Sequence, residues 1–143
     1  MHLPLRRTGV AAVALGLTLG ACSSAGSSTA TTVSVSGIRH LDVDTFAALV
    51  ATKATVVLDV RTAQEFGTGH LPSAKNVDVN AADFDTRLAS LDKATTYAVY
   101  CHSGNRSGQA LQRMATAGFT RVADLSGGIT AWTSAGRATT TSG

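Results

Sequence analysis

The sequence predicts an α/β fold in which a mainly parallel sheet of five strands carries helices on both faces. Two observations lead to this fold class. Short apolar runs alternate along the chain with amphipathic runs of helical period, which is the pattern of a parallel sheet covered by helices. At 143 residues, 44% of them hydrophobic, the chain has room for one domain of this kind.

The expected elements follow one another at short intervals. The predicted strands cover residues 35–41, 55–60, 76–79, 97–100 and 121–124, and the predicted helices cover residues 43–51, 83–91, 107–117 and 128–134. Asp42 is the expected N-cap of the first helix, and Gly118 follows the third helix in the position of a C-terminal cap. Gly127 and Gly128 suit a tight turn from the last strand into the last helix.

The N-terminal segment is typical of a secretory signal. A short basic head precedes an uninterrupted run of small and apolar residues at 9–21, which is too short to span a membrane. The ending Leu-Gly-Ala-Cys at 19–22 resembles a bacterial lipobox, so we expect cleavage before Cys22 and a diacylglyceryl group on its thiol. The alternative is an ordinary secretory signal with a cysteine nearby. The pair Arg6-Arg7 indicates twin-arginine export only weakly, which leaves the export route open.

Composition divides the chain into four parts. They are a signal peptide at residues 1–21, a flexible tether at 22–36, a folded domain at 37–135 and a disordered tail at 136–143. The tether consists almost entirely of Ser, Thr, Ala, Gly and Val and has no large apolar residue with which to build a core. We therefore expect an exported protein that is lipid-anchored on the outer face of the bacterial cytoplasmic membrane.

The charge of the chain excludes several classes of partner. The formal net charge of +3 includes Arg6 and Arg7, which the predicted cleavage removes, so neither nucleic acid nor a polybasic membrane contact is expected. The histidines of the mature chain, His40, His70 and His102, lack ligand spacing. The sequence thus predicts no metal site and no cofactor, and membrane contact through the lipid anchor alone.

Cys101 is the candidate catalytic residue. It stands where a predicted strand passes into a helix, and it is one of only two cysteines, so lipidation of Cys22 leaves it without a disulfide partner. A helix N-terminus and the guanidinium of Arg106 both favour the thiolate. The expected binding loop is His102, Ser103, Gly104, Asn105 and Arg106, with backbone amides turned toward the sulfur. The alternative is an inert buried cysteine, which the polar flanking residues disfavour.

The length of this loop indicates which anion it holds. Four residues separate Cys101 from Arg106. Cysteine phosphatases cradle a tetrahedral phosphate in a loop one residue longer, so this ring suits a single transferred sulfur atom instead. A phosphatase or arsenate reductase is disfavoured for the same reason.

Three ordered motifs resemble the rhodanese family of single-domain sulfurtransferases. They are the cysteine loop itself, an earlier segment with LDVR at 58–61, EF at 65–66 and GHLPSAKN at 69–76, and a later segment with LSGGI at 125–129 and AW at 131–132. The resemblance implies a rhodanese-like fold. It also implies an enzyme that moves a sulfane sulfur from thiosulfate or a similar donor to a thiol or cyanide acceptor through a Cys101 persulfide. A persulfide carrier or redox-sensing lipoprotein without useful turnover is the alternative.

Four further residues are expected to support the loop. Asp59 ends an apolar strand, and the resemblance implies that its carboxylate braces the catalytic loop. Arg61, Glu65 and His70 can form an adjoining polar cluster, for which a solvated surface cluster is the alternative. His70 precedes a proline turn and is expected to be structural rather than a base. His102 either donates to an incoming anion or faces solvent.

Overall fold

The structure, a computed structural model, describes residues 36–142. In chain order its elements are β1 (Gly37–Leu41), α1 (Val43–Val50), β2 (Thr55–Asp59), α2 (Ala63–Thr68), β3 (Lys75–Asn76), α3 (Phe84–Ala89), β4 (Thr96–Tyr100), α4 (Asn105–Thr116), β5 (Arg121–Leu125) and α5 (Gly128–Ser134). The predicted signal peptide, the predicted lipidation site Cys22 and the tether up to residue 35 lie outside the described residues.

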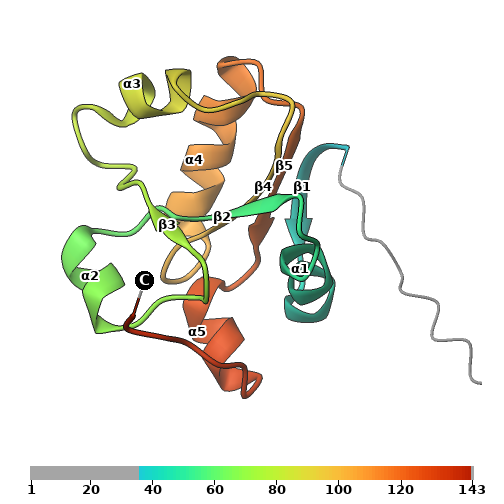
Figure 1. Ribbon diagram of the computed structural model, residues 1–143, viewed down its shortest axis with the longest axis vertical. Helices are drawn as coiled ribbons and strands as arrows, with labels where there is room; N and C mark the ends of the chain where they lie inside the picture. Colours follow the sequence, from blue (N-terminus) through green and yellow to red (C-terminus); the bar gives the residue numbers. More distant parts are fainter. Residues whose placement is uncertain (1–35, 143) are drawn as a thin grey trace, which may run out of the picture.

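The five strands form one sheet in the order β1-β5-β4-β2-β3, and every pairing in it is parallel (Figure 1). The predicted fold class is confirmed. In a parallel sheet the carboxyl ends of all strands meet at one edge, where loops and helix N-termini converge on ligands. Because β4 lies between β2 and β5, the loop that follows β4 occupies the middle of this edge.

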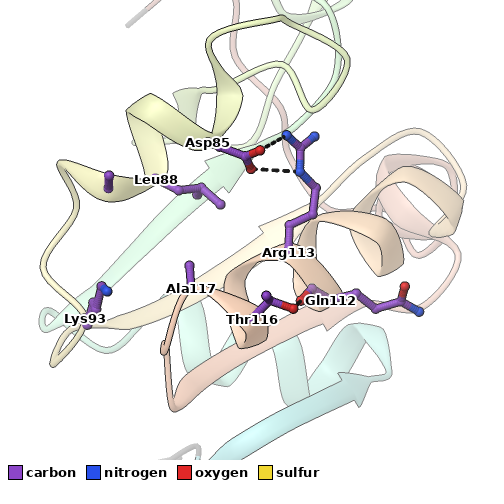
Figure 2. A pocket seen from close by; sticks show the side chains of 8 residues that line it. Asp85, Leu88, Lys93, Gln112, Arg113, Thr116 and Ala117 are labelled. Carbon is purple, nitrogen blue, oxygen red and sulfur yellow. Dashed lines mark hydrogen bonds and ion pairs between the residues drawn. The ribbon is translucent and has the colours of Figure 1, made fainter.

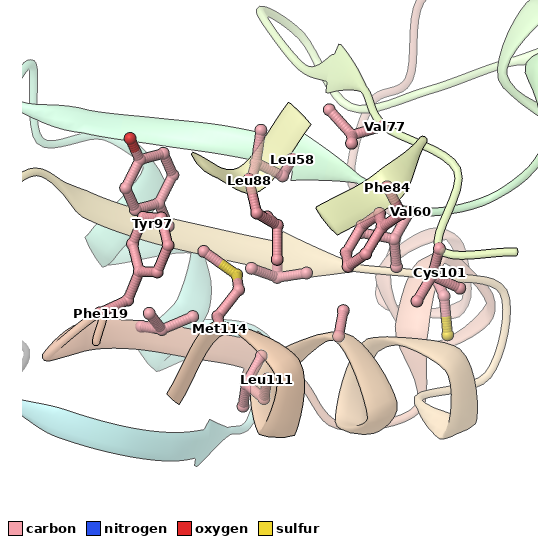
Figure 3. Packing of buried hydrophobic residues seen from close by; sticks show 14 residues of the cluster. Leu58, Val60, Val77, Phe84, Leu88, Tyr97, Cys101, Leu111, Met114 and Phe119 are labelled. Carbon is pink, nitrogen blue, oxygen red and sulfur yellow. The ribbon is translucent and has the colours of Figure 1, made fainter. Parts of the chain in front are cut away.

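Each face of the sheet has its own apolar core. On β4 the side chains alternate, so that Tyr97 and Val99 pack with α3 and α4, whereas Ala98 and Tyr100 pack with α1 and α5. Figure 3 shows the core under α4, in which Tyr97 and Phe119 lie at one end and Cys101 at the other. Cys101 is therefore the last member of a buried row, held in place by the packing behind it.

Helix α2 is absent from the sequence-based prediction. Its N-cap, Thr62, accepts from the backbone N–H of Glu65 at 3.2 Å, while the Glu65 carboxylate accepts from the Thr62 N–H at 3.1 Å. This reciprocal pair is a capping box, and its sequence signature, threonine followed three residues later by glutamate, was present in the chain. None of its six residues is buried, so the apolar periodicity that marks a packed helix is missing.

Strand β3 is shorter than predicted and begins one residue earlier. Only Lys75–Asn76 pairs with β2 as a regular ladder. Beyond it the amides of Val77 and Val79 still donate to the carbonyls of Asp59 and Val60, at 2.9 and 3.2 Å. Both valine side chains are buried in the core under α4.

The C-terminal tail departs from the expected disorder over its described part. Backbone groups of His70 and Thr140 exchange two hydrogen bonds, at 2.9 and 2.8 Å, and the indole N–H of Trp132 donates to the carbonyl of Ala138. Arg137 pairs with Asp44 at the start of α1. Polar composition alone does not predict this, because two of the partners, His70 and Asp44, lie far away in the sequence. Within residues 36–142 no helix is long and apolar enough to cross a membrane.

Candidate active site

Cys101 directly follows β4 and is almost fully buried, at 1% exposure. Its sulfur accepts a hydrogen bond from the backbone N–H of Gly104 at 3.1 Å. It also lies 3.7 Å from the hydroxyl oxygen of Ser107. Of the amides expected to surround the sulfur, from His102 to Arg106, that of Gly104 is the one within hydrogen-bonding distance. The loop thus supplies one preformed amide donor to the sulfur.

Gly104 gives the loop its turn. Its φ of +98° lies in the left-handed region, and it is the N-cap of α4, which begins two residues earlier than predicted. A Cβ on this residue would lie 3.3 Å from the backbone nitrogen of Gly127. Both the backbone angle and the space therefore favour glycine, and the tight turn aims the start of α4 at the sulfur.

The carbonyls of the loop face the start of α5. The N–H of Ile129 donates to the Cys101 carbonyl at 2.8 Å, and the N–H and hydroxyl of Thr130 donate to the His102 carbonyl at 3.2 and 3.0 Å. A Cβ on Gly128 would lie 2.5 Å from both carbonyl oxygens, so these backbones can meet only at glycine. Two orphan donors of the α5 N-terminus are satisfied in this way, and the carbonyls of Cys101 and His102 are directed toward α5.

Arg106 lies in the first turn of α4 and forms an ion pair with Glu65 of α2. Two parallel hydrogen bonds of 2.8 and 2.6 Å join the guanidinium to the two carboxylate oxygens. The bond from Arg106 lowers the pKa of Glu65 to about 2. Glu65 in turn raises the pKa of Arg106, and a Coulombic interaction with Cys101 raises it to a smaller extent. The pair is 24% and 33% exposed at its two side chains, so it forms the partly open rim of the loop.

Asp59 and Arg61 form a second ion pair, which is buried. The Arg61 side chain donates to both oxygens of Asp59 at 2.6–3.0 Å and also to the Gly69 carbonyl at 2.7 Å. Asp59 has no hydrogen bond to the cysteine loop; its carboxylate instead fixes Arg61, which lies 5.7 Å over the Tyr100 ring. The expected brace is therefore indirect, and the expected cluster of Arg61, Glu65 and His70 is split between two separate ion pairs and a structural histidine.

His70 is built into the scaffold. Its Nδ1 lies 3.0 Å from the Phe66 carbonyl, its ring stacks on Phe66 at 3.7 Å, and its backbone pairs with Thr140. These contacts agree with the structural role expected for it. His102 is exposed, and beside it lies a pocket of about 420 Å³. Most of the residues that line the pocket are of polar type, and the full set is Arg61, Glu65, Thr68, Gly69, His102, Ile129, Thr130, Thr133 and Thr139.

A larger pocket lies elsewhere. It measures about 510 Å³ and lies between α3 and α4, crossed by the ion pair of Asp85 and Arg113 (Figure 2). None of the predicted site residues lines it. Within residues 36–142, no group of three or more histidine, cysteine, aspartate or glutamate side chains could hold a metal ion.

Three residues near the sulfur are absent from the sequence-based site. The hydroxyl of Ser107 donates to Asp124 at 2.8 Å, and Asp124 in turn lies 2.6 Å from Nδ1 of His40. The sequence signal for them was Asp124, a carboxylate within the apolar run of β5. In the structure this side chain is only 2% exposed. A buried carboxylate requires partners, and sequence alone does not name them.

The family of the chain follows from comparison with known proteins. The family model described as Rhodanese-like domain matches residues 42–135. This chain belongs to the rhodanese-like domain family. The match covers both ion pairs, the cysteine loop and the glycine turn before α5.

Relatives of this rhodanese-like chain include named sulfurtransferases. "Thiosulfate sulfurtransferase GlpE" of Shewanella oneidensis is 30% identical over 99 residues, which cover 68% of this chain and 95% of that one. "Sulfurtransferase" of Allochromatium vinosum is 33% identical over 59% of this chain and 77% of that one. An uncharacterized Synechocystis protein is 36% identical, and the match spans 45% of its length. The crystal structure of a rhodanese-related protein from Thermoplasma volcanium superposes with a TM-score of 0.65 at 27% identity, over 73% of this chain and 99% of that one.

Proposed function

We propose that the protein is a sulfurtransferase that moves a sulfane sulfur from thiosulfate or a similar donor to a thiophilic acceptor through a Cys101 persulfide. The observation that carries the proposal is the hydrogen bond from the Gly104 amide to the Cys101 sulfur, at the N-terminus of α4. It stabilises a negative sulfur. The names of the Shewanella and Allochromatium relatives support the same reaction class.

The reaction needs two displacement steps. The Cys101 thiolate attacks the outer sulfur of thiosulfate, a bond forms between the two sulfurs, and sulfite departs with the electron pair of the broken bond. A thiolate or cyanide then attacks the outer sulfur of the persulfide, and the Cys101 thiolate leaves. The Gly104 amide, which already points at the sulfur, stabilises the charge without rearrangement.

The burial of Cys101 limits which donors can react. At 1% exposure the sulfur is reached only by a narrow atom or after a small opening of the loop. We therefore propose a preference for thiosulfate and other donors whose reacting sulfur is terminal and unbranched. The pocket beside His102 is the proposed binding site for the remainder of the donor or acceptor, because it lies next to the loop and its threonine hydroxyl oxygens can still accept hydrogen bonds.

A test of the persulfide uses intact-protein mass spectrometry after treatment with thiosulfate. The expected product carries one added sulfur atom, which Cys101→Ser does not acquire and which cyanide removes. A matched control is Cys22→Ala, which keeps Cys101 as the single thiol and should load as the natural chain does. An unmodified Cys101, under conditions that load a known sulfurtransferase, contradicts the proposal.

A persulfide carrier without turnover is the second candidate, and the burial of Cys101 favours it, because a shielded persulfide survives until a partner opens the loop. Steady-state kinetics separate the two. Ping-pong turnover with a small thiol indicates an enzyme, whereas stoichiometric loading with negligible turnover indicates a carrier.

We also propose that the protein is exported and anchored by lipid at Cys22. The support is the N-terminal pattern, with its basic head, apolar run and lipobox-like ending. Detergent-phase partitioning of membranes from cells that express the chain should recover it in the detergent phase, and Cys22→Ala should move it to the aqueous phase. Equal partitioning of both forms contradicts lipidation.

A further inference from the structure

A hydrogen-bonded chain of side chains leads from the Cys101 sulfur to the protein surface. Ser107 Oγ lies 3.7 Å from the sulfur and donates to Asp124 Oδ2 at 2.8 Å. Asp124 Oδ1 lies 2.6 Å from His40 Nδ1. Ser107 and Asp124 are 0% and 2% exposed, whereas 66% of the His40 side chain is exposed. Solvent therefore reaches the chain at His40, and the reacting sulfur lies at its buried end.

Sheet topology produces this arrangement. His40 of β1 and Asp124 of β5 are direct partners in the parallel register. β5 in turn pairs with β4, which ends just before Cys101. Ser107, in the first turn of α4, fills the space between the carboxylate and the sulfur. Three adjacent strands and one helix thus place the four groups in a row.

The Ser107 hydroxyl has a single proton and several acceptors for it. Asp124 lies at 2.8 Å, the Gly104 carbonyl at 3.0 Å and the sulfur at 3.7 Å. While the proton points at Asp124, the sulfur faces only a lone pair of the hydroxyl, an arrangement that favours a protonated thiol, which then donates. If the proton turns to the sulfur, it stabilises a thiolate or persulfide anion. Whether the Ser107 proton points at Asp124 or at the sulfur depends on how strongly the Asp124 carboxylate attracts it.

We propose that Ser107, Asp124 and His40 are positioning residues that set the charge of the Cys101 sulfur according to the protonation state of His40. A protonated His40 compensates the charge of Asp124. Asp124 then attracts the Ser107 hydroxyl proton less strongly, and the hydroxyl can donate to the sulfur. When His40 is neutral, Asp124 is the stronger acceptor for the Ser107 proton. The equilibrium of Cys101 then shifts from the thiolate toward the thiol. The inference deepens the proposed sulfur transfer and rests on it for its biological meaning.

Other charged groups near the loop are already paired or require a control. Arg106 of α4 and Glu65 of α2 form the ion pair of the rim. Neither β4 nor α5 carries a charged residue, and Arg121 of β5 donates to the Ala94 carbonyl. At the start of α1, Asp44 pairs with Arg137 and the N-cap Asp42 accepts from the Thr45 N–H. His102, which follows Cys101, is a second exposed histidine and must be tested separately.

The test measures the rate of Cys101 alkylation by iodoacetamide as a function of pH, in the full chain carrying Cys22→Ala. We expect His40→Gln to slow alkylation about threefold to tenfold below neutral pH and to move the midpoint of the profile to higher pH. Arg39→Gln removes a positive charge from the neighbouring exposed residue of β1 and should leave the profile unchanged. His102→Gln reports the contribution of the other exposed histidine.

A double-variant comparison separates the chain from general surface charge. In an Asp124→Asn background, His40→Gln should have no further effect, because the group that connects it to the sulfur is neutral. Ser107→Ala should remove the dependence on His40, and Ser107→Thr, which keeps the hydroxyl, should restore it. Circular dichroism would show whether Asp124→Asn folds. If it does not, the His40 and Ser107 variants still test whether the effect of His40 on Cys101 passes through the Ser107 hydroxyl.

Two outcomes overturn the inference. One is an identical pH profile for His40→Gln and its parent, and the other is an equal effect of Arg39→Gln. Because alkylation requires no sulfur donor, its outcome is independent of the proposed reaction. A shifted alkylation profile in a protein that never forms a persulfide would refute sulfur transfer and leave the hydrogen-bonded chain intact.

Discussion

Two arginine–carboxylate pairs lie at the same edge of the sheet and differ in burial. The side chains of Arg61 and Asp59 are 5% and 0% exposed, whereas those of Arg106 and Glu65 are 24% and 33% exposed. A buried ion pair stays closed because separating its two groups would leave each charge unpaired in the protein interior, which solvates charge poorly. A partly exposed pair can open at little cost, because water replaces the lost partner. The first pair therefore acts as scaffold, and the second can release Arg106 toward an anion in the loop.

The largest expected effect is on stability, at the buried pair. Arg61→Met should lower the free energy of unfolding by about 3–5 kcal/mol, because Asp59 remains buried without its partner. The double variant Asp59→Asn with Arg61→Met should recover much of this loss, since it leaves no buried charge. Urea denaturation measures both. Arg87→Met, which breaks an exposed pair with Asp83, is the matched control and should cost less than about 1 kcal/mol. A small loss for Arg61→Met would refute the scaffold role.

The next effect is on activity, at the exposed pair. Arg106→Gln should reduce the rate of persulfide formation from thiosulfate about tenfold, because a positive charge near the developing anion is lost. Its unfolding free energy should change by about 1 kcal/mol or less. The control is Arg113→Gln, on the same helix but paired with Asp85 over the distant pocket, which should react at the normal rate. Equal rates for the natural chain, Arg106→Gln and Arg113→Gln would show that Arg106 has only a structural role, in its ion pair with Glu65.

The smallest effect is a pH dependence of stability. The pKa of Glu65 falls to about 2 in the folded protein, from about 4.3 in an unfolded chain. A lowered folded pKa means that the stabilisation is complete above pH ~4.3 and is lost as the pH falls toward about 2. Glu65→Gln should therefore be less stable than the natural chain by up to about 1 kcal/mol at neutral pH. Thermal unfolding at stepwise lower pH checks this, and a constant gap down to the lowest pH would contradict it.

Local patterns in the sequence were sufficient for most of the fold. The apolar run of β4, the Asp42 cap of α1 and the glycine that ends α4 all act within a few residues. Each was predicted and agrees with the structure. The capping box of α2 was equally local, but the exposed helix behind it lacked an apolar stripe and was missed.

The amino-acid sequence by itself determined the parallel α/β architecture and the place of Cys101 between a strand and a helix. Side-chain period and turn residues act over short range, so they can be recognised without knowledge of the fold. Tertiary structure alone decided the partners: Glu65 with Arg106, 41 residues apart, and His40 with Asp124, 84 residues apart. Charged groups pair with whichever partner the packed chain brings within reach. That choice depends on strand order and burial, which no short stretch of sequence contains.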